Sequence, residues 1–282
     1  MNALFGPAGN SDAFVKSGHK KTVEAMAWLE EIGLDAYEYQ CGRGVNVDAA
    51  TLAAIRAEAE AHNIALSLHA PYFISLSGIV EEKRLKSLDY IKQSLDACAA
   101  LGGYLIVIHT GSASKISRAE AVELAKDTMS RVLEQNDHPE IRLGLETMGK
   151  ENQLGTLEEV IEICKLDRRL WPVVDWGHMN ARNVGGLFTD VDSYRRVFET
   201  IGETLGDQYA NELHCHFSKI EYTEKGEKRH LTFEDTQFGP PPEPLMECIA
   251  KYGYAPRMIC ESAGTQSDDA LYMKREYWKH LK

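Results

Sequence analysis

Histidines and acidic residues stand at the ends of six short apolar segments of the chain. In chain order these ends are His69, His109, Glu146, Asp175, His214 (in His214-Cys-His216) and Glu261. Neutral imidazoles and carboxylates that converge in one pocket suit Zn²⁺, Mn²⁺ or Fe²⁺ better than Ca²⁺ or Mg²⁺, which prefer shells made only of oxygen. The residue types therefore predict a metal centre, provided that the fold gathers them.

Two more histidines lie where they could join such a centre. His178 follows Asp175 by about one helical turn in Asp175-Trp-Gly-His178, and His230 lies in the long segment 218–241, which has no clear helical or strand pattern. Long loops in compact domains are usually functional. A single strand-terminal histidine or glutamate is more often an ordinary polar residue, but six in equivalent positions would be costly to bury without a shared partner. The set therefore favours a metal site.

The elements that must position these side chains alternate along the sequence. Strand-like apolar segments cover residues 2–5, 36–40, 65–69, 104–109, 142–146, 172–175, 212–216 and 257–261. Amphipathic helical segments cover residues 20–31, 48–61, 81–101, 118–135, 157–165, 191–200, 242–252 and 268–282. Strict alternation, at about 35 residues per strand–helix pair, predicts a parallel α/β sheet closed into a single (βα)8 TIM barrel over residues 1–282. In such a barrel all the carboxyl ends of the strands lie on one face, where the active sites of this fold are found.

Composition limits the class of protein. The 282 residues are 44% hydrophobic and 26% charged, which is typical of a soluble globular protein. No apolar run approaches the ~18 residues of a membrane-spanning helix, and the N-terminus does not resemble a signal peptide, so we expect a cytoplasmic protein with scattered, reduced cysteines. The net charge of −12 argues against non-specific nucleic-acid binding of the histone type, although a metal-filled pocket can still attract a local phosphate.

Several short motifs follow one another along the chain, each occurring once. They are the segment 67–76 (Ser-Leu-His-Ala-Pro-Tyr-Phe-Ile-Ser-Leu), Ile108-His109-Thr-Gly111, Leu145-Glu146-Thr-Met-Gly149 with Asn152-Gln-Leu-Gly155, Asp175-Trp-Gly-His178, Leu213-His214-Cys-His-Phe-Ser-Lys219, Arg229-His230 and Ile259-Cys-Glu261-Ser. As an ordered set over about residues 3–265, they resemble the endonuclease IV family of apurinic/apyrimidinic endonucleases (AP endonuclease family 2), within the xylose isomerase-like TIM barrel superfamily. The resemblance implies three clustered divalent ions, usually zinc.

The resemblance also assigns metal ligands. It implies that His69 and His109 hold one ion, that Glu146 bridges it to a second completed by Asp175, His214 and Glu261, and that His178 and His230 hold a third. The family has an aspartate two residues before its last histidine, where this chain has Lys228. The alternatives are that Glu227, His216 or a substrate phosphate takes the place of this aspartate, or that the third ion is weak or absent.

The reaction implied is hydrolysis of the DNA phosphodiester 5′ to an abasic site in damaged double-stranded DNA, as in base excision repair. Clustered ions clamp the phosphate and lower the pKa of a water toward ~7. The resemblance gives catalytic roles to Glu146, which positions the nucleophile, and to Glu261, which lies nearest the attacking water. The expected substrate contacts are Tyr72, Arg43, Lys219 and Arg229. No membrane or protein partner is implied.

A second reaction remains open on the same fold. Sugar isomerases and epimerases of this superfamily use a ligand set of the type Glu146, Asp175, His214 and Glu261 around one ion, and their two glutamates move a proton between carbons. The four other histidines speak against this alternative, because a one-ion site does not need them. Lys228, the altered His216-Phe217 segment and a pI near 5.3 speak for it. A non-catalytic nucleic-acid-binding barrel is the least favoured reading.

Overall fold

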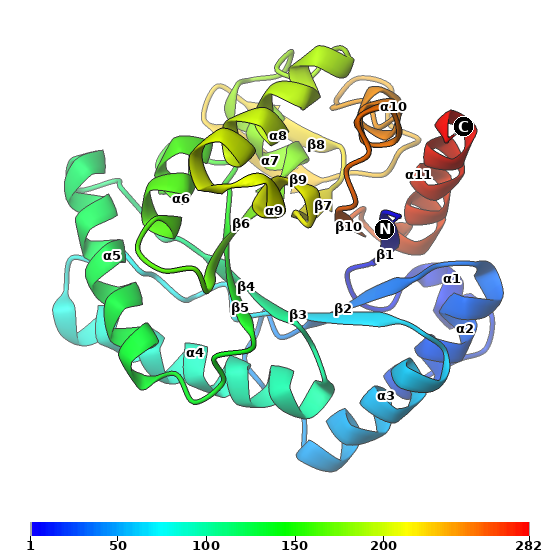
Figure 1. The fold of residues 1–282 in the computed structure, drawn as a ribbon, viewed down its shortest axis with the longest axis horizontal. Coiled ribbons are helices and arrows are strands. Elements are labelled where there is room, and N and C mark those ends of the chain that lie inside the picture. Colours follow the sequence, from blue (N-terminus) through cyan, green and yellow to red (C-terminus); the bar gives the residue numbers. More distant parts are fainter. Residues whose placement is uncertain (1, 282) are drawn as a thin grey trace.

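The computed structural model describes residues 2–281, and it is a barrel of eight parallel strands surrounded by helices (Figure 1). The strands are β1 (Leu4–Pro7), β2 (Ala36–Gln40), β3 (Ala65–His69), β4 (Leu105–His109), β5 (Arg142–Glu146), β6 (Leu170–Asp175), β7 (His214–Phe217) and β10 (Arg257–Cys260). Their order in the sheet is β1-β10-β7-β6-β5-β4-β3-β2. A parallel bridge between Ala8 and Glu38 joins β1 to β2, the first and last strands of this order, so the barrel is nearly closed.

Each barrel strand is followed by at least one helix. The outer helices are α2 (Ala25–Ile32), α3 (Ala49–Ala61), α4 (Glu81–Leu101), α5 (Arg118–Gln135), α6 (Leu157–Cys164), α8 (Val191–Leu205), α10 (Glu243–Tyr252) and α11 (Gln266–His280). Shorter helical turns are α1 (Asp12–Lys16), η1 (Thr22–Glu24), α7 (Trp176–Arg182) and α9 (Asp207–Asn211). The (βα)8 fold and the order of the eight units predicted from the sequence are confirmed.

Side chains alternate along each strand between two environments. Ile106 and Ile108 of β4 face the helices and belong to the large outer core, whereas Leu105 and Val107 belong to a small cluster inside the barrel. Because every second side chain of a strand points to the same side, His109 points into the barrel like Leu105 and Val107. The barrel interior is apolar near the amino ends of the strands and becomes polar toward their carboxyl ends.

Gly6 allows the barrel to close. A methyl group at this position would overlap the carbonyl group of Ala36 on β2, so a larger residue would hold the two strands apart. Close approach of β1 and β2 matters for the site, because β2 supplies the buried carboxylate of Glu38 to the barrel interior.

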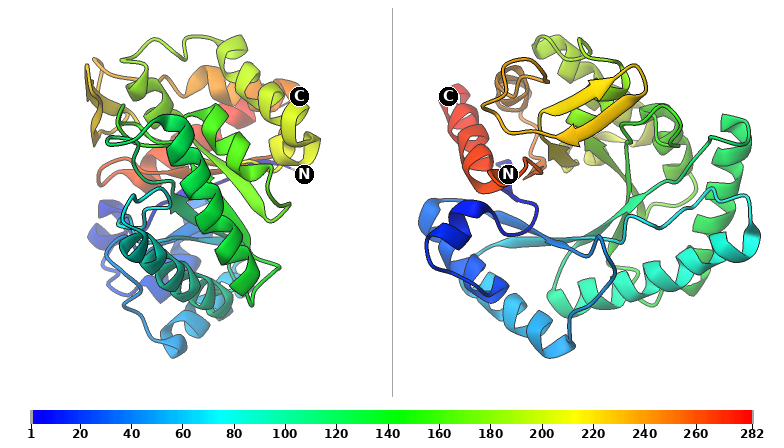
Figure 2. Two further views of the ribbon diagram at one scale, coloured as in Figure 1. Left: turned by 90° about the vertical axis from the view of Figure 1, so that its left-hand side faces the viewer. Right: turned by 180° about the vertical axis from the view of Figure 1, so that it is seen from behind.

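The segment 218–241 is more ordered than the sequence indicated. It contains an antiparallel hairpin of β8 (Ile220–Thr223) and β9 (Gly226–His230), seen as two yellow arrows in the right-hand view of Figure 2. The hairpin docks on the loop after β5, where the amide of Glu227 donates to the carbonyl of Gly149 at 3.0 Å. β9 is strongly charged and lacks the apolar alternation that reveals a strand in sequence, and β8 alternates over only four residues, which is too short to stand out.

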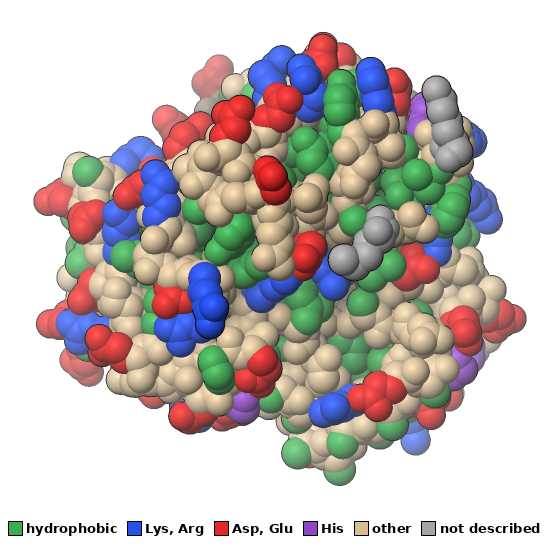
Figure 3. All heavy atoms as spheres, in the orientation of Figure 1, with side chains coloured by type: hydrophobic (Ala, Val, Ile, Leu, Met, Phe, Trp, Pro, Cys, Tyr) green, Lys and Arg blue, Asp and Glu red, His purple; other side chains and the backbone are tan. Residues whose placement is uncertain are grey.

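The surface agrees with the composition. On the face shown in Figure 3, acidic and basic side chains are interspersed and form no continuous basic patch. Among residues 2–281, no helix is both long enough and apolar enough to cross a bilayer.

Candidate metal centre

A pocket of ≈ 440 Å³ opens at the carboxyl ends of the barrel strands. Seven of its lining side chains are metal-ligand types, namely His69, His109, Glu146, His178, Glu227, His230 and Glu261. Four of the six predicted strand-end residues therefore line one pocket, and Asp175 lies next to Glu146 and Glu261 without lining it. His214 is treated below.

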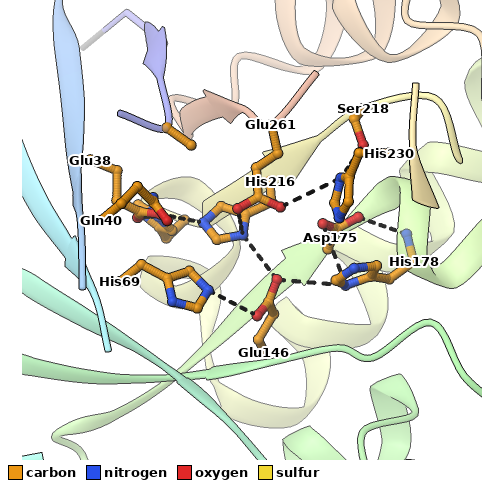
Figure 4. A network of polar contacts seen from close by, with 12 residues as sticks. Glu38, Gln40, His69, Glu146, Asp175, His178, His216, Ser218, His230 and Glu261 are labelled. Carbon is orange, nitrogen blue, oxygen red and sulfur yellow. Dashed lines mark hydrogen bonds and ion pairs between the residues drawn. The ribbon is translucent and has the colours of Figure 1, made fainter. Parts of the chain in front are cut away.

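Five groups of described side chains have ligand atoms within 4.8 Å of one another and could each hold a cation, and three of these groups together include every metal-ligand type that lines the pocket. The first group is His69, His109 and Glu146; the second is Glu146, Asp175, His216 and Glu261; the third is His178, Glu227 and His230. Glu146 belongs to two of the groups, and Figure 4 shows its carboxylate between His69, His216 and His178. The arrangement is a cluster of adjoining sites rather than one isolated site.

Strand register brings these residues side by side. His109 is the register partner of Glu146 between β4 and β5, and Asp175 is the partner of His216 between β6 and β7. Glu261 directly follows β10, whose last residue pairs with Phe217. Side chains of one face of a parallel sheet are thereby stacked around the same end of the barrel axis.

His216, rather than His214, enters the second group. Its Nδ1 lies 2.9 Å from Glu146 Oε1 and 3.5 Å from Glu261 Oε1. His214 faces the same way but lies two residues, or roughly 6.6 Å, deeper in the barrel. There its Nε2 lies 2.9 Å from Glu38 Oε2 and its Nδ1 contacts the hydroxyl of Tyr104. The sequence motif alone assigned the ligand role to His214. The strand register pairs Asp175 with His216 instead, and it is His216 whose ring lies beside Glu146 and Glu261.

Glu227, rather than Lys228, faces the third group. Glu227 Oε2 lies 3.5 Å from His178 Nε2, whereas Lys228 Nζ turns away to Glu221 Oε1 at 2.5 Å. The cause is a β-bulge in the hairpin, where Glu221 pairs with Arg229 and Tyr222 pairs with Glu227, so that Lys228 is left without a register partner. Of the alternatives left open by the sequence, the geometry favours Glu227.

Hydrogen bonds fix the orientation of the histidine rings. His69 Nδ1 lies 2.7 Å from the carbonyl of Ala70, and His178 Nδ1 lies 3.0 Å from the carbonyl of Thr147. A carbonyl only accepts, so each Nδ1 carries the hydrogen and each Nε2 is directed at the pocket. Metal-binding histidines in proteins are commonly held in this way by an oxygen behind them.

The charges of the cluster are tightly coupled. Burial raises the pKa of Glu146, but the neighbouring histidines outweigh it and hold the pKa well below its ordinary value. Burial lowers the pKa of His69, but the carboxylate of Glu146, 3.6 Å from its Nε2, raises the pKa to about 9. The pKa of His178 is raised to about 9 in the same way, chiefly by Asp175 against the effect of burial. Protons on the imidazoles thus balance buried carboxylates in the protein alone.

The donor set fits divalent cations. Glu146 Oε2 and Asp175 Oδ2 are buried without a hydrogen bond, although His109 Nε2 lies 3.1 Å from the former and His178 Nδ1 lies 3.4 Å from the latter. Burial, together with the neighbouring carboxylates of Glu261 and Glu146, raises the pKa of Asp175 to about 6 despite the opposing charge of His178. Oxygen atoms that lack partners beside imidazole nitrogens are suited to Zn²⁺, Mn²⁺ or Fe²⁺.

The expected substrate contacts divide into two pairs. Tyr72 lines the pocket and is 56% exposed, and Arg43 is exposed on the loop after β2. Lys219 instead donates to the carbonyls of Phe233 and Asp235, at 3.0 and 2.5 Å. Arg229 forms an ion pair with Glu221, and neither Lys219 nor Arg229 lines the pocket.

Other pocket residues were missed by sequence reasoning. Gln40, Lys150 and Gln153 line the pocket. Lys150 and Gln153 lie within the Gly149–Gly155 loop, next to residues already singled out, but nothing in their spacing distinguished them from surface residues.

Comparison with known proteins places this geometry in a family. The profile described as xylose isomerase-like TIM barrel matches residues 26–279. The chain is 28% identical to the uncharacterized protein MJ0133 of Methanocaldococcus jannaschii, over 96% of each chain. It is also 28% identical to a probable endonuclease 4 of Mycoplasma pneumoniae, over 57% of this chain and 56% of that relative, so this match spans only about half of either protein.

The solved structures show the fold alone. The apo structure of the 3-keto-D-glucoside 4-epimerase YcjR from E. coli superposes with a TM-score of 0.69 at 17% identity, covering 99% of this chain and 100% of that chain. The same barrel therefore occurs among relatives named for two different reactions.

Proposed function

The chain belongs to the xylose isomerase-like TIM barrel family, and from this premise we propose that it is a metal-dependent phosphodiester hydrolase that cleaves DNA 5′ to abasic sites. The single observation that carries the proposal is the gathering of three ligand groups with Glu146 shared between two of them. The partial similarity to an endonuclease 4 supports the same class of reaction.

A one-ion sugar isomerase would leave much of this pocket unexplained. The second group alone supplies four ligands, which is enough for one divalent ion. Four histidines and Glu227 would then be buried or half-buried beside it without a chemical role, a costly arrangement for ionisable groups. A multi-ion centre gives each of them a partner.

The chain's own residues have distinct tasks in the proposed reaction. When bound, divalent ions in these groups would stabilise charge on a phosphoryl oxygen and supply hydroxide near neutral pH. Glu146, held at 3.1 Å by His109 and at 2.9 Å by His216, fixes the spacing of the first two groups. Glu261 also lines the pocket, and in the proposed reaction it would take the proton of the attacking water.

Tyr72 has a role at the pocket mouth. Its ring is mostly exposed and stands next to Phe73, with ring centroids 6.2 Å apart. An exposed aromatic pair beside a metal pocket suits stacking on a base or sugar next to a lesion. An abasic nucleotide enters such a pocket at low cost, because no base pair has to be broken.

The test combines metal analysis with a cleavage assay. Elemental analysis of the zinc-loaded protein should give two or three ions per chain, and the protein should nick a duplex that carries one abasic-site analogue but not the matched intact duplex. Glu261→Gln should abolish nicking, whereas Glu82→Gln, on the exposed surface of α4, should not change it. A protein that holds at least two ions and leaves the lesion duplex intact would contradict the proposal.

A keto-sugar epimerase is the second candidate, and a specific observation favours it. Two of the four cationic or aromatic side chains expected to bind DNA, Lys219 and Arg229, are engaged elsewhere, and the chain carries a net charge of −12. In this alternative Glu146 and Glu261, which share the second group, would move a proton between sugar carbons. A stoichiometry of one ion together with deuterium exchange from solvent into a ketohexose would establish it in place of the nuclease.

A further inference from the structure

A layer of polar side chains lies in the barrel directly beneath the metal centre. Glu38, Ser67 and His214 are each at most 1% exposed, and the proposed reaction uses none of them. Glu38 lies at the centre of this layer, on the inner face of β2. A buried carboxylate is costly unless its oxygen atoms are paired, so its partners indicate why it is there.

Both oxygen atoms of Glu38 are engaged. Oε2 accepts a hydrogen bond from Ser67 Oγ at 2.9 Å and lies 2.9 Å from His214 Nε2. Oε1 accepts from Gln40 Nε2 at 3.2 Å and lies 3.0 Å from His216 Nε2. The carboxylate thus joins the deep layer to a residue of the second ligand group.

We propose that Glu38 is a positioning residue that holds the ring of His216 from behind, so that Nδ1 of His216 is the atom presented to a metal ion. The proposal rests on the metal centre of the proposed function. His216 stands between the two carboxylates, with Nε2 toward Glu38 and Nδ1 2.9 Å from Glu146 Oε1, as Figure 4 shows.

Hydrogen-bonding chemistry determines which nitrogen of His216 is available. In this structure both nitrogens of His216 face ionised carboxylates: Nδ1 lies 2.9 Å from Glu146 Oε1, and Nε2 lies 3.0 Å from Glu38 Oε1 as an ion-pair contact without hydrogen-bond geometry. An ionised carboxylate only accepts, so a cation that binds between His216 and Glu146 would take the place of the hydrogen on Nδ1, whereas the hydrogen on Nε2 would stay toward Glu38. A carboxylate behind a histidine also makes the opposite nitrogen a stronger ligand. Glu38 therefore sets both the direction and the donor strength of His216.

His214 completes the support on the deep side. Its Nε2 faces Glu38, and its Nδ1 contacts the hydroxyl of Tyr104, whose ring lies under the guanidinium of Arg257 at 4.0 Å. The ring of His214 therefore has a partner on both nitrogens, and with Glu38 and His216 it forms a further group whose ligand atoms lie within 4.8 Å of one another. Its role is to keep the carboxylate of Glu38 in place, which accounts for a second inward histidine on β7.

The experiment measures metal binding directly, without reliance on catalysis. Co²⁺ is titrated into metal-free wild-type protein, Glu38→Gln and Ser67→Ala, with chelator competition for affinity and visible absorption for ligand geometry. Glu38→Gln should bind the ion of the second group about 10–100-fold more weakly and with an altered spectrum. Ser67→Ala removes one hydrogen bond to the far oxygen of Glu38 and should change affinity by less than about threefold, and His216→Ala sets the limit for complete loss of the ligand.

The outcomes separate the two proposals. Wild-type affinity and an unchanged spectrum in Glu38→Gln would overturn the positioning role while leaving the metal centre intact. Failure of the wild-type protein to bind Co²⁺ in the second group would overturn both. If Glu38→Gln does not fold, Glu38→Asp replaces it, because this variant keeps the charge but withdraws the carboxylate by one methylene. Glu38→Asp should also bind the ion of the second group more weakly and with an altered spectrum. Wild-type affinity and spectrum in Glu38→Asp would refute the proposal.

Discussion

Glu227 Oε2 lies 3.5 Å from His178 Nε2, although Glu227 belongs to the hairpin and His178 to helix α7 at the end of β6. The bulge at Lys228 turns Glu227 and His230, which are three positions apart, toward the same group. The third ligand group therefore exists only while the hairpin is docked on the barrel.

Removing the carboxylate of Glu227 should release one ion. In Glu227→Gln we expect metal content to fall by one ion per chain, because a neutral amide is a poorer ligand for a divalent cation than a carboxylate. Elemental analysis after gel filtration measures this directly. Glu224→Gln, in the turn of the same hairpin, is the matched control, and equal metal content in all three proteins would exclude Glu227 as a ligand.

Gly226 should be required for docking of the hairpin. It has φ +87°, and a methyl group there would overlap the carbonyl of Gly149, which accepts from the Glu227 amide at 3.0 Å. Gly33 has nearly the same φ, +86°, but nothing within 4 Å, so Gly33→Ala isolates the backbone cost of about 1–2 kcal/mol.

Gly226→Ala should therefore lose more stability than Gly33→Ala in urea unfolding and should also lose the third ion. If Gly226→Ala kept the metal content of the wild-type protein, the hairpin would still be docked despite the added methyl group, and the prediction would be wrong.

Glu146→Gln should affect two ions at once. Its carboxylate is shared by the first and second groups, so we expect the content of both ions to fall and lesion cleavage to drop by at least about 10²-fold. Asp175→Asn, which alters the second group alone, is the comparison. Loss of the same number of ions in both variants would contradict a bridging position for Glu146.

The metal-free protein should lose stability as pH rises. His69 and His178 have a pKa of about 9 in the folded chain against 6.5 when unperturbed, so their contribution is complete below about pH 6.5 and is lost as pH rises through about 9. Asp175, with its pKa near 6, is nearly fully ionised in both states above about pH 7 and adds no slope at alkaline pH.

Thermal unfolding between these pH values measures the effect. The melting temperature of the metal-free protein should fall, and His69→Gln should flatten the fall. Because ligand nitrogens must give up their protons to bind an ion, metal affinity should rise over the same interval. A melting temperature independent of pH in this window would contradict raised pKa values at both histidines.

Arg43 should contribute to DNA binding through charge. It is exposed on the loop after β2, near the pocket residue Gly42, and a phosphate contact there would release about one counterion. Arg43→Ala should weaken binding to lesion duplex and reduce the slope of log affinity against log salt by about one. Arg56→Ala, on α3 and paired with Glu60 at 2.8 Å, is the control; an unchanged slope in Arg43→Ala would exclude the contact.

The barrel was predictable because its signals are local. Apolar strands of about five residues alternate with amphipathic helices, and this alternation is visible in any window of the chain. The convergence of His69, His109, Glu146 and Glu261 followed from the same alternation, since a barrel places all strand ends on one face. The hairpin escaped prediction because β8 is only four residues long, β9 is charged, and the hairpin is held by backbone contacts to the loop after β5.

By itself the sequence determined the architecture and the metal-ligand types at the ends of the strands, since residue type and spacing along one strand or helix are enough for both. Only the tertiary structure decided which atoms form the centre. His214 and His216 lie on the same face of β7, and register against Asp175 on a neighbouring strand selects His216. Glu227 depends on a bulge, and Glu38 is brought beneath the centre by closure of the barrel. Register, bulges and closure arise from pairing between distant segments, and no local pattern encodes them.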